Sequence, residues 1–248
     1  MLSSIHSNFI IQFPYNLEKI LFSLHNFVKF HFSQKIDDSQ VKFLKDKLIL
    51  VNNKDDKIGS INKLDAHKIS KNNLFPHRAF SILLFDRNNR LLLQQRSQQK
   101  FTFPLLWTNT CCSHPLVGEK ITNSLQKRLN FELGIKAKRN IFHLIDKIIY
   151  KAPSNKIFEE FELDYLYLAK IMDKKFISDN IKYNKDEVNN IKFIYLDELI
   201  EDIKNNPNKY TPWFKIIIKY KEKDIRKFLE KGKRAVSFDG RIKSYINY

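Results

Sequence analysis

Two adjacent cysteines, Cys111 and Cys112, stand in the polar segment Trp107-Thr-Asn-Thr-Cys-Cys-Ser-His-Pro115. A thiol among hydroxyl groups, two residues from the imidazole of His114, could act as a nucleophile or as a proton donor. The alternative is that each thiol is a small buried apolar group, the commoner role of a free cysteine. Neighbouring cysteines cannot cross-link distant parts of a chain, so we expect a reducing compartment rather than a disulfide scaffold.

A second group of candidate residues is the acidic run Phe158-Glu-Glu-Phe-Glu-Leu-Asp-Tyr165. Alternate side chains of a strand point to the same side, so Glu160 and Glu162 would share a face. Their Cα atoms would lie roughly 6.6 Å apart, which allows both carboxylates to bind one cation. Asp164 continues the same face, so an acidic, solvent-exposed edge of the sheet is the alternative interpretation.

Three histidines complete the candidate site. Any one of His67, His77 and His114 alone would be interpreted as a surface histidine or a hydrogen-bonded core histidine. Three neutral imidazoles with two carboxylates, however, make a five-ligand site of nitrogen and oxygen atoms. Such a site suits Zn²⁺, Mn²⁺ or Mg²⁺. A structural zinc site of cysteines is not expected, because the chain has no Cys-x-x-Cys pair.

These residues need a scaffold, and the hydrophobic pattern predicts an α+β domain. Short apolar runs predict strands at residues 47–51, 79–85, 90–96, 143–151, 162–169 and 191–195. The polar residues 86–89 indicate that the second and third of these strands form a hairpin.

Helices are predicted between and after these strands. The first runs from about residue 119 to 133, with Ile121, Leu125 and Leu129 as its buried stripe and Gly134 as its end. A second helix begins near Asp197, and a last helix runs from about residue 213 into the charged tail.

The chain is predicted to contain an N-terminal extension at residues 1–42 and one domain at residues 43–248 that ends in a helical segment. Apolar residues in the extension repeat at helical spacing after Asn16, a candidate N-cap; they are Leu17, Ile20, Leu21, Leu24 and Val28. The extension is poor in acids and has no arginine. An organelle import sequence, a docked helix and a disordered leader are its three interpretations. We expect a cytoplasmic protein, with plastid or mitochondrial import through residues 1–40 as the alternative.

The composition excludes several classes of protein. Five isolated glycines provide no Gly-rich loop of the kind that binds dinucleotides or phosphates. No apolar run reaches the ~18 residues that span a bilayer. The net charge of +17 is typical of proteins with a nucleic-acid or anionic partner. Because the lysines are scattered and Lys, Asn, Ile and Phe are abundant throughout, we attribute the charge to composition and expect no nucleic-acid partner.

The order of the motifs resembles that of type I isopentenyl-diphosphate Δ-isomerase, a family with a Nudix-type α/β/α fold. The resemblance covers about residues 46–220. It is carried by His77-Arg-Ala-Phe-Ser, Leu91-Leu-Leu-Gln-Gln-Arg-Ser, Thr102-Phe-Pro, Thr108-Asn-Thr-Cys-Cys-Ser-His-Pro115, Glu132-Leu-Gly and Thr211-Pro-Trp-Phe-Lys215. It implies a sandwich with a mixed sheet. It also implies the interconversion of isopentenyl and dimethylallyl diphosphate, in isoprenoid biosynthesis, through a carbocation.

The resemblance also implies the roles of individual residues. Cys112 would be the catalytic thiol, Glu162 the opposing acid or base, and Tyr150 the hydroxyl that assists protonation. Trp213 would present its aromatic face to the carbocation. The ligands of a divalent metal would be His67, His77, His114, Glu160 and Glu162, with Glu132 holding a second ion, Mg²⁺, beside the diphosphate. The residues that contact the diphosphate or support the site would be Lys63, Arg96, Lys100 and Ser113.

The chemistry of this reaction matches those residue types. Moving a double bond by one carbon requires one proton delivered to an alkene and another removed from a neighbouring carbon, so an acid and a base must flank the substrate. An indole face stabilises the cation by about 0.5–2 kcal/mol. Arginine, lysine and Mg²⁺ suit a diphosphate.

Two other functions remain open from the sequence alone. A Nudix-type pyrophosphohydrolase needs several carboxylates on its helix, and the run Lys127-Arg-Leu-Asn-Phe-Glu-Leu-Gly134 retains only Glu132. A nucleic-acid-binding module would use the basic charge without turnover. We expect a monomeric enzyme that acts on a small-molecule diphosphate.

Overall fold

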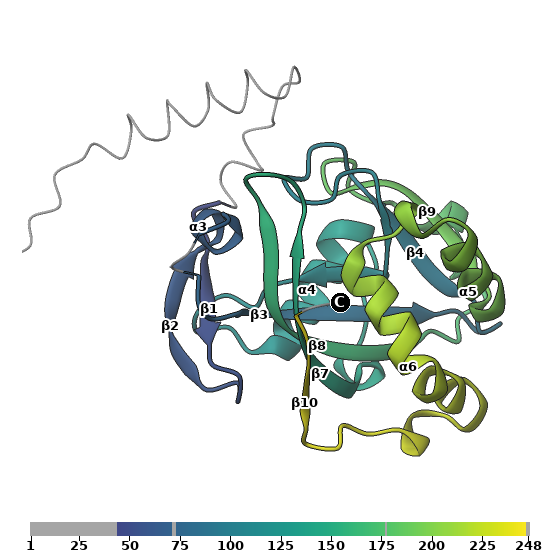
Figure 1. Ribbon diagram of the computed structural model, residues 1–248. Helices are drawn as coiled ribbons and strands as arrows, with labels where there is room; N and C mark the ends of the chain where they lie inside the picture. The colour runs from purple at the N-terminus through teal and green to yellow at the C-terminus, as the bar shows by residue number, and fades with distance from the viewer. Residues whose placement is uncertain (1–43, 71–72, 177, 247–248) are drawn as a thin grey trace, which may run out of the picture. The chain divides into compact units, whose positions relative to one another are not determined.

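The computed structural model describes residues 44–70, 73–176 and 178–246. The predicted extension at residues 1–42, with its helical repeat, lies outside the described residues. The described chain builds a mixed ten-stranded sheet with helices on both of its faces (Figure 1). This is the α+β sandwich that the sequence predicts.

The strands follow one another as β1 (Lys47–Val51), β2 (Lys57–Asn62), β3 (His77–Phe85), β4 (Leu91–Arg96), β5 (Trp107–Thr108), β6 (Cys111–Ser113), β7 (His143–Pro153), β8 (Glu159–Lys170), β9 (Val188–Ile194) and β10 (Ile242–Tyr245). The α-helices are α3 (Lys63–His67), α4 (Ile121–Leu133), α5 (Leu196–Asn205) and α6 (Pro212–Lys231). Short 3-10 turns lie at Arg139–Ile141, Ser178–Asn180, Pro207–Lys209 and Lys233–Ala235.

Strand β3 lies in the middle of the sheet, whose main path runs β10-β7-β8-β3-β1-β2. Strand β3 is parallel to β8, and β10 is parallel to β7, whereas the other ladders are antiparallel. Strand β6 pairs with residues 80–82 of β3. Strand β4 lies off the main path and pairs with β5 and β9 as well as with β3. The sheet therefore branches at β3, where strands from distant parts of the chain meet.

The side chains of β3 alternate between two cores. Phe80, Ile82 and Leu84 belong to the core that contains the buried face of α4. Leu83 and Phe85 belong to the core that contains the buried face of α6. Complete burial of each such side chain contributes about 1.5–3 kcal/mol, so both helices are held firmly to opposite faces of the strand.

Helix α4 confirms the predicted stripe and its end. It begins at residue 121, two residues after the predicted start, and Leu125 and Leu129 are fully buried. Gly134 adopts a left-handed φ of 67° and donates its N–H to the carbonyl of Asn130. A Cβ atom at this position would lie 2.7 Å from the carbonyl oxygen of Lys182, so a close approach as well as the turn requires glycine.

The predicted hairpin of residues 79–85 and 90–96 is only partly correct. Both strands exist, but β3 and β4 share a single paired position, Phe85 with Leu91. The turn itself is well formed, because the carboxylate of Asp86 accepts hydrogen bonds from the backbone N–H groups of Asn88 and Arg90. Beyond it β4 pairs with β9, so tertiary pairing overrides the local hairpin.

Five of the described strands and α-helices were not predicted: β2, α3, β5, β6 and β10. Strand β2 is largely exposed and lacks a clear apolar alternation. Helix α3 has only five residues, too few for a periodic signal. Strand β10 pairs in parallel with β7 from Ile242 to Tyr245, a contact between segments far apart in sequence.

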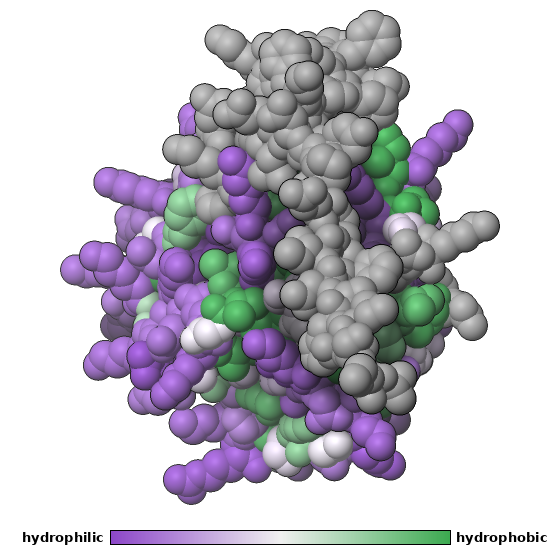
Figure 2. Space-filling view, turned by 90° about the vertical axis from the view of Figure 1, so that its left-hand side faces the viewer, coloured by the Kyte–Doolittle hydropathy of each residue, from purple (hydrophilic) through white to green (hydrophobic). Residues whose placement is uncertain are grey.

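Figure 2 shows the side of the molecule that carries β1, β2 and α3. Hydrophilic side chains dominate the described surface there, with small groups of hydrophobic ones between them. Isolated apolar residues on a surface are normal and require no partner. Among the residues that the structure describes, none of the helices has the length and apolar character needed to cross a bilayer.

Candidate active site

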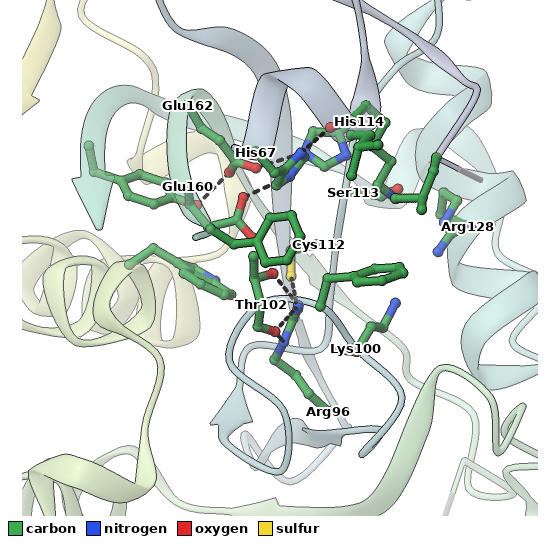
Figure 3. A pocket seen from close by; sticks show the side chains of 17 residues that line it. His67, Arg96, Lys100, Thr102, Cys112, Ser113, His114, Arg128, Glu160 and Glu162 are labelled. Atoms are coloured by element: carbon green, nitrogen blue, oxygen red, sulfur yellow. Dashed lines mark hydrogen bonds and ion pairs between the residues drawn. The ribbon is translucent and has the colours of Figure 1, made fainter. Parts of the chain in front are cut away.

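One pocket collects most of the residues singled out in the sequence (Figure 3). The predicted residues that line it are Lys63, His67, Arg96, Lys100, Cys112, Ser113, His114, Tyr150, Glu160, Glu162 and Trp213. Residues from α3, from four strands and from the start of α6 thus converge, although they span most of the described chain. Two predicted residues, His77 and Glu132, do not line this pocket.

The strand register explains why these side chains meet. In the parallel ladder of β3 and β8, His77 lies level with Glu162. In the antiparallel ladder of β7 and β8, Glu162 lies opposite Tyr150. Cys112 on β6 pairs with Ser81 of β3 and packs against the core of α6. Adjacent strands therefore present these groups on one face of the sheet.

The two cysteines face opposite sides of β6, as strand alternation predicts. Cys111 is completely buried in the core of α4. Cys112 lines the pocket, with its Sγ 3.9 Å from Nη1 of Arg96. Burial raises the pKa of the Cys112 thiol to about 12, although the nearby Arg96 guanidinium acts in the opposite direction. At neutral pH the thiol of the free enzyme therefore carries its proton.

Five buried or half-buried side chains gather around one point, and Figure 3 shows four of them, His67, His114, Glu160 and Glu162, at the upper end of the pocket. One ligand atom from each lies within 4.8 Å of the others, and the group consists of His67, His77, His114, Glu160 and Glu162. The closest pairs include His114 Nε2 with Glu162 Oε1 at 2.7 Å and His77 Nε2 with His114 Nε2 at 3.1 Å. Three ring nitrogens and two carboxylates thus face a common centre.

Details of this group fit a divalent metal ion. Oε2 of Glu160 is buried and accepts no hydrogen bond, although Nε2 of His67 lies only 2.9 Å away. That geometry is expected of two ligands that point at a shared centre rather than at each other. On its other side the His67 ring places Nδ1 2.7 Å from the carbonyl of Lys63. If Nδ1 donates its proton there, the lone pair of Nε2 faces the centre.

Burial and charge keep four of these five groups in the forms that bind metals, and His67 is the exception. Burial lowers the pKa of His77, and burial with the neighbouring histidines lowers that of His114 well below its usual value, so both rings stay neutral. Burial also opposes charge on His67, but the Glu160 carboxylate outweighs it and the pKa of His67 rises. Burial would raise the pKa values of Glu160 and Glu162, yet their histidine partners lower both, and the carboxylates stay ionised.

Glu162 also takes part in an aromatic contact on the other side of the pocket. The hydroxyl of Tyr150 donates a hydrogen bond of 2.5 Å to Glu162 Oε2. The rings of Tyr150 and Trp213 are stacked, with centroids 5.9 Å apart. Nε1 of Trp213 donates to Oδ1 of the buried Asn109 at 3.1 Å, which fixes the rotation of the indole. The two oxygens of Glu162 therefore serve different neighbours, one the histidines and the other the tyrosine.

Positive charge gathers around the opposite end of the pocket. Lys63, Lys100 and Arg128 all line it, and Lys100 hydrogen-bonds to the buried carboxylate of Glu187. Burial and the charges of Lys100 and Arg128 lower the pKa of Lys63 to about 8. Cations held close together in a half-enclosed site are the arrangement that attracts a multiply charged anion.

Glu132 lies apart from the five-residue group. Its two oxygens accept hydrogen bonds from Arg128 on the same helix, at 2.8 Å, and from Gln94 on β4, at 3.0 Å. Arg128 also donates to Glu187 and so bridges the two carboxylates. The structure brings Glu132 close to the cations of the pocket but not to the histidines.

The sequence of this chain is similar to those of known proteins. A NUDIX domain model matches residues 75–214. The isopentenyl-diphosphate delta-isomerase of Schizosaccharomyces pombe is 36% identical over 200 residues, which cover 74% of this chain and 85% of that protein. Isopentenyl-diphosphate Delta-isomerase I of Camptotheca acuminata is 42% identical over 193 residues, 70% of this chain and 79% of that one. This chain belongs to the isopentenyl-diphosphate Δ-isomerase family.

A solved structure supports the fold of this Δ-isomerase family member. The crystal structure of DR0079 from Deinococcus radiodurans superposes with a TM-score of 0.50 at 13% identity, covering 70% of this chain and 97% of that one. At that identity the likeness concerns the fold alone. The Nudix-type sandwich implied by the motif order is therefore confirmed.

In this Δ-isomerase family member, four polar residues around the pocket were not predicted from the sequence. They are Thr102, Asn109, Arg128 and Glu187. The spacing of Arg128 and Glu132 by four residues on a helix was a usable signal for that ion pair. Glu187 has no local signal, because its partners come from two other segments. The alternative interpretation of an acidic, solvent-exposed edge at Asp164 is wrong: this residue is buried, and its Oδ2 accepts a hydrogen bond from Ser81.

Proposed function

We propose that this protein interconverts isopentenyl and dimethylallyl diphosphate, as the names of its relatives indicate. The observation that carries the proposal is that Cys112 and Glu162, from β6 and β8, line one pocket. A thiol and a carboxylate are the two proton-transfer groups that the reaction needs. Had the two lain in separate regions, the proposal would have had no chemical basis.

In this proposal the two groups act on either side of the alkene. One adds a proton to the terminal carbon of the double bond, and the other removes a proton from the carbon next to the tertiary centre. The hydroxyl of Tyr150, held at 2.5 Å from Glu162, assists proton delivery on the carboxylate side. Trp213 lines the same pocket, where its indole face stabilises the tertiary cation by about 0.5–2 kcal/mol.

The cationic end of the pocket would hold the diphosphate. We assign Lys63, Lys100 and Ser113 to direct contacts, because all three line the pocket. Arg96 lines the pocket and also stabilises a loop, because its Nε and Nη2 atoms donate hydrogen bonds to the carbonyls of Thr102 and Phe103. The guanidinium group thus contributes charge to the pocket and fixes the loop that follows β4.

The five-residue group of histidines and glutamates would hold a divalent ion. We propose Mg²⁺, Mn²⁺ or Zn²⁺, because the ligands are nitrogen and oxygen atoms. When bound, the ion would fix the position of the Glu162 carboxylate and tune its acidity. We further propose Glu132 as the ligand of a second ion, Mg²⁺, beside the diphosphate, which requires that Arg128 shares or releases that carboxylate.

The test is direct. Purified full-length protein is incubated with isopentenyl diphosphate and Mg²⁺, and the allylic isomer is followed by its second methyl signal in proton NMR. We expect the isomer to appear, a chelator to abolish it, and added divalent metal to restore it. Release of phosphate or pyrophosphate without isomer would instead favour a pyrophosphohydrolase. Salt-dependent RNA binding with no turnover would favour a nucleic-acid-binding module.

Three further statements are proposals about the whole chain. We propose that residues 43–248 form the catalytic domain, that the enzyme is a monomer, and that it works in the cytoplasm. Import into a plastid or mitochondrion is the alternative. Fusing residues 1–42 to a fluorescent protein tests the compartment, because an import sequence would carry the fusion into the organelle. Light scattering of the purified chain tests the oligomeric state.

A further inference from the structure

Thr102 connects the two ends of the pocket. It is buried, with 5% of its surface exposed, in the loop between β4 and β5. Its Oγ1 lies 2.5 Å from Oε1 of Glu160 and 3.1 Å from Nη2 of Arg96 (Figure 3). An arginine only donates and an ionised carboxylate only accepts, so the hydroxyl accepts from Arg96 and gives its single proton to Glu160.

This hydrogen bond determines the orientation of Glu160. A carboxylate rotates as a unit, so a fixed Oε1 also fixes Oε2. Oε2 of Glu160 is the atom that faces Nε2 of His67 at 2.9 Å without accepting a hydrogen bond. The Thr102 hydroxyl therefore sets the direction of the oxygen that points at the centre of the five-residue group.

The loop does not need this hydroxyl to keep its shape. The carbonyls of Thr102 and Phe103 accept hydrogen bonds from Arg96, and the N–H of Phe103 donates to Oγ of Ser154 at 2.8 Å. Phe103 and Leu105 adopt positive φ angles of 47° and 61°, which side chains other than glycine rarely do. Such a conformation persists only where the surroundings enforce it, and these backbone contacts provide that enforcement.

We propose that Thr102 is a positioning residue for the metal ion: its hydroxyl, polarised by Arg96, orients the Glu160 carboxylate as a ligand. The inference rests on the proposed function in one respect, namely that the five-residue group holds a divalent ion. Groups that hydrogen-bond to metal ligands commonly change metal affinity roughly 10–100-fold when they are removed. Arg96, at the diphosphate end, would thereby influence the metal end through one shared hydroxyl.

The experiment measures metal affinity directly. Full-length protein is stripped of metal with a chelator, and Mn²⁺ is titrated while the free ion is followed by electron paramagnetic resonance. Thr102→Val removes the hydroxyl with little change of shape, Thr102→Ser retains it, and Ser154→Ala removes a different side-chain hydrogen bond to the same loop. We expect Mn²⁺ to bind roughly 10-fold or more weakly to Thr102→Val. Thr102→Ser and Ser154→Ala should stay within about two-fold of the wild type.

A second measurement separates positioning from general damage. Excess Mn²⁺ should restore most of the isomerase activity of Thr102→Val, since only the ligand geometry is impaired. Thr102→Ala is titrated in parallel, and the variant that keeps the wild-type circular dichroism decides the test. If neither variant folds, the hydroxyl is a folding requirement and the inference is overturned.

Two further outcomes overturn the inference. One is an affinity of Thr102→Val within two-fold of the wild type, and the other is an equal loss in Ser154→Ala. A wild-type chain that binds no Mn²⁺ would overturn it as well. A wild-type chain that binds Mn²⁺ and fails to isomerise would count against the proposed function alone, so the two failures can be told apart.

Discussion

Cys111 and Cys112 are neighbours in the chain but belong to different parts of the molecule. Because side chains alternate on β6, Cys111 enters the core of α4 while Cys112 lines the pocket. We therefore expect Cys112→Ala to lower the turnover number by at least roughly 100-fold, because a proton-transfer group contributes about 10²–10⁴-fold. Cys111→Ala should keep the turnover number near that of the wild type, with only some loss of stability. The NMR assay above measures both, and an active Cys112→Ala enzyme would exclude the proposed mechanism.

Trp213 offers a second test at the level of the residue. Its indole stacks on Tyr150 and lies edge-on to Phe103, so replacing it removes packing as well as an aromatic face. Trp213→Phe keeps much of the packing but presents a weaker face to a cation. We expect Trp213→Phe to reduce the turnover number several-fold and Trp213→Ala to reduce it more, with smaller changes in the KM for isopentenyl diphosphate. A change confined to KM would contradict stabilisation of the cation.

Among individual residues, the sequence identified those that belong to recognisable motifs. Alternation placed Glu160 and Glu162 on one face, and the structure gathers both with three histidines. It could not identify Thr102 or Glu187, because their roles depend on partners brought together by strand pairing. Nor could it settle whether Asp164 is exposed, since an alternating acidic strand has the same pattern whether or not another element covers it.

At the level of elements, glycine conformation provides a prediction with a built-in control. Gly134 has a φ of 67° and Gly118 a φ of 84°, so alanine would be strained at both positions. A Cβ atom at Gly134 would also meet the Lys182 carbonyl, whereas at Gly118 it would have nothing within 4 Å. We expect Gly118→Ala to lower the free energy of unfolding by about 1 kcal/mol and Gly134→Ala to lower it by more, up to about 3 kcal/mol. Chemical denaturation measures both, and equal losses would argue against the close contact at Gly134.

Elements with strong local signals were predicted well. The strand at residues 47–51 is confirmed with its bounds, and α4, α5 and α6 begin within two residues of their predicted starts. The hairpin was wrong in its pairing, because β4 finds more partners in β9 than in β3. Helix α3 was missed although it contributes Lys63 and His67 to the pocket, since five residues carry no periodicity. Short elements that depend on docking leave little trace in the sequence.

The lowered pKa of one buried carboxyl group predicts how the stability of the whole molecule depends on pH. Burial disfavours the charged form of Glu187, but Lys100 and Arg128 outweigh it and lower its pKa from 4.5 to about 2. A carboxyl group with a depressed pKa in the folded state stabilises the fold above its unfolded pKa and loses that contribution as pH falls. We expect the melting temperature to fall between about pH 4.5 and pH 2, and Glu187→Gln to reduce this dependence. Calorimetry across that range checks the prediction, and identical pH profiles for the two proteins would contradict it.

The last described strand also bears on how the protein is made. Strand β10 covers the outer edge of β7, with Tyr245 level with Tyr150, and Lys221 and Lys243 both pair with the buried Asp146. During synthesis from the N-terminus, β7 emerges from the ribosome long before β10. A nascent chain therefore exposes the edge of β7 until residues 242–245 have emerged, and such an edge can pair with a neighbouring copy. Between these two events the edge of β7 is open to strand pairing between copies of this enzyme.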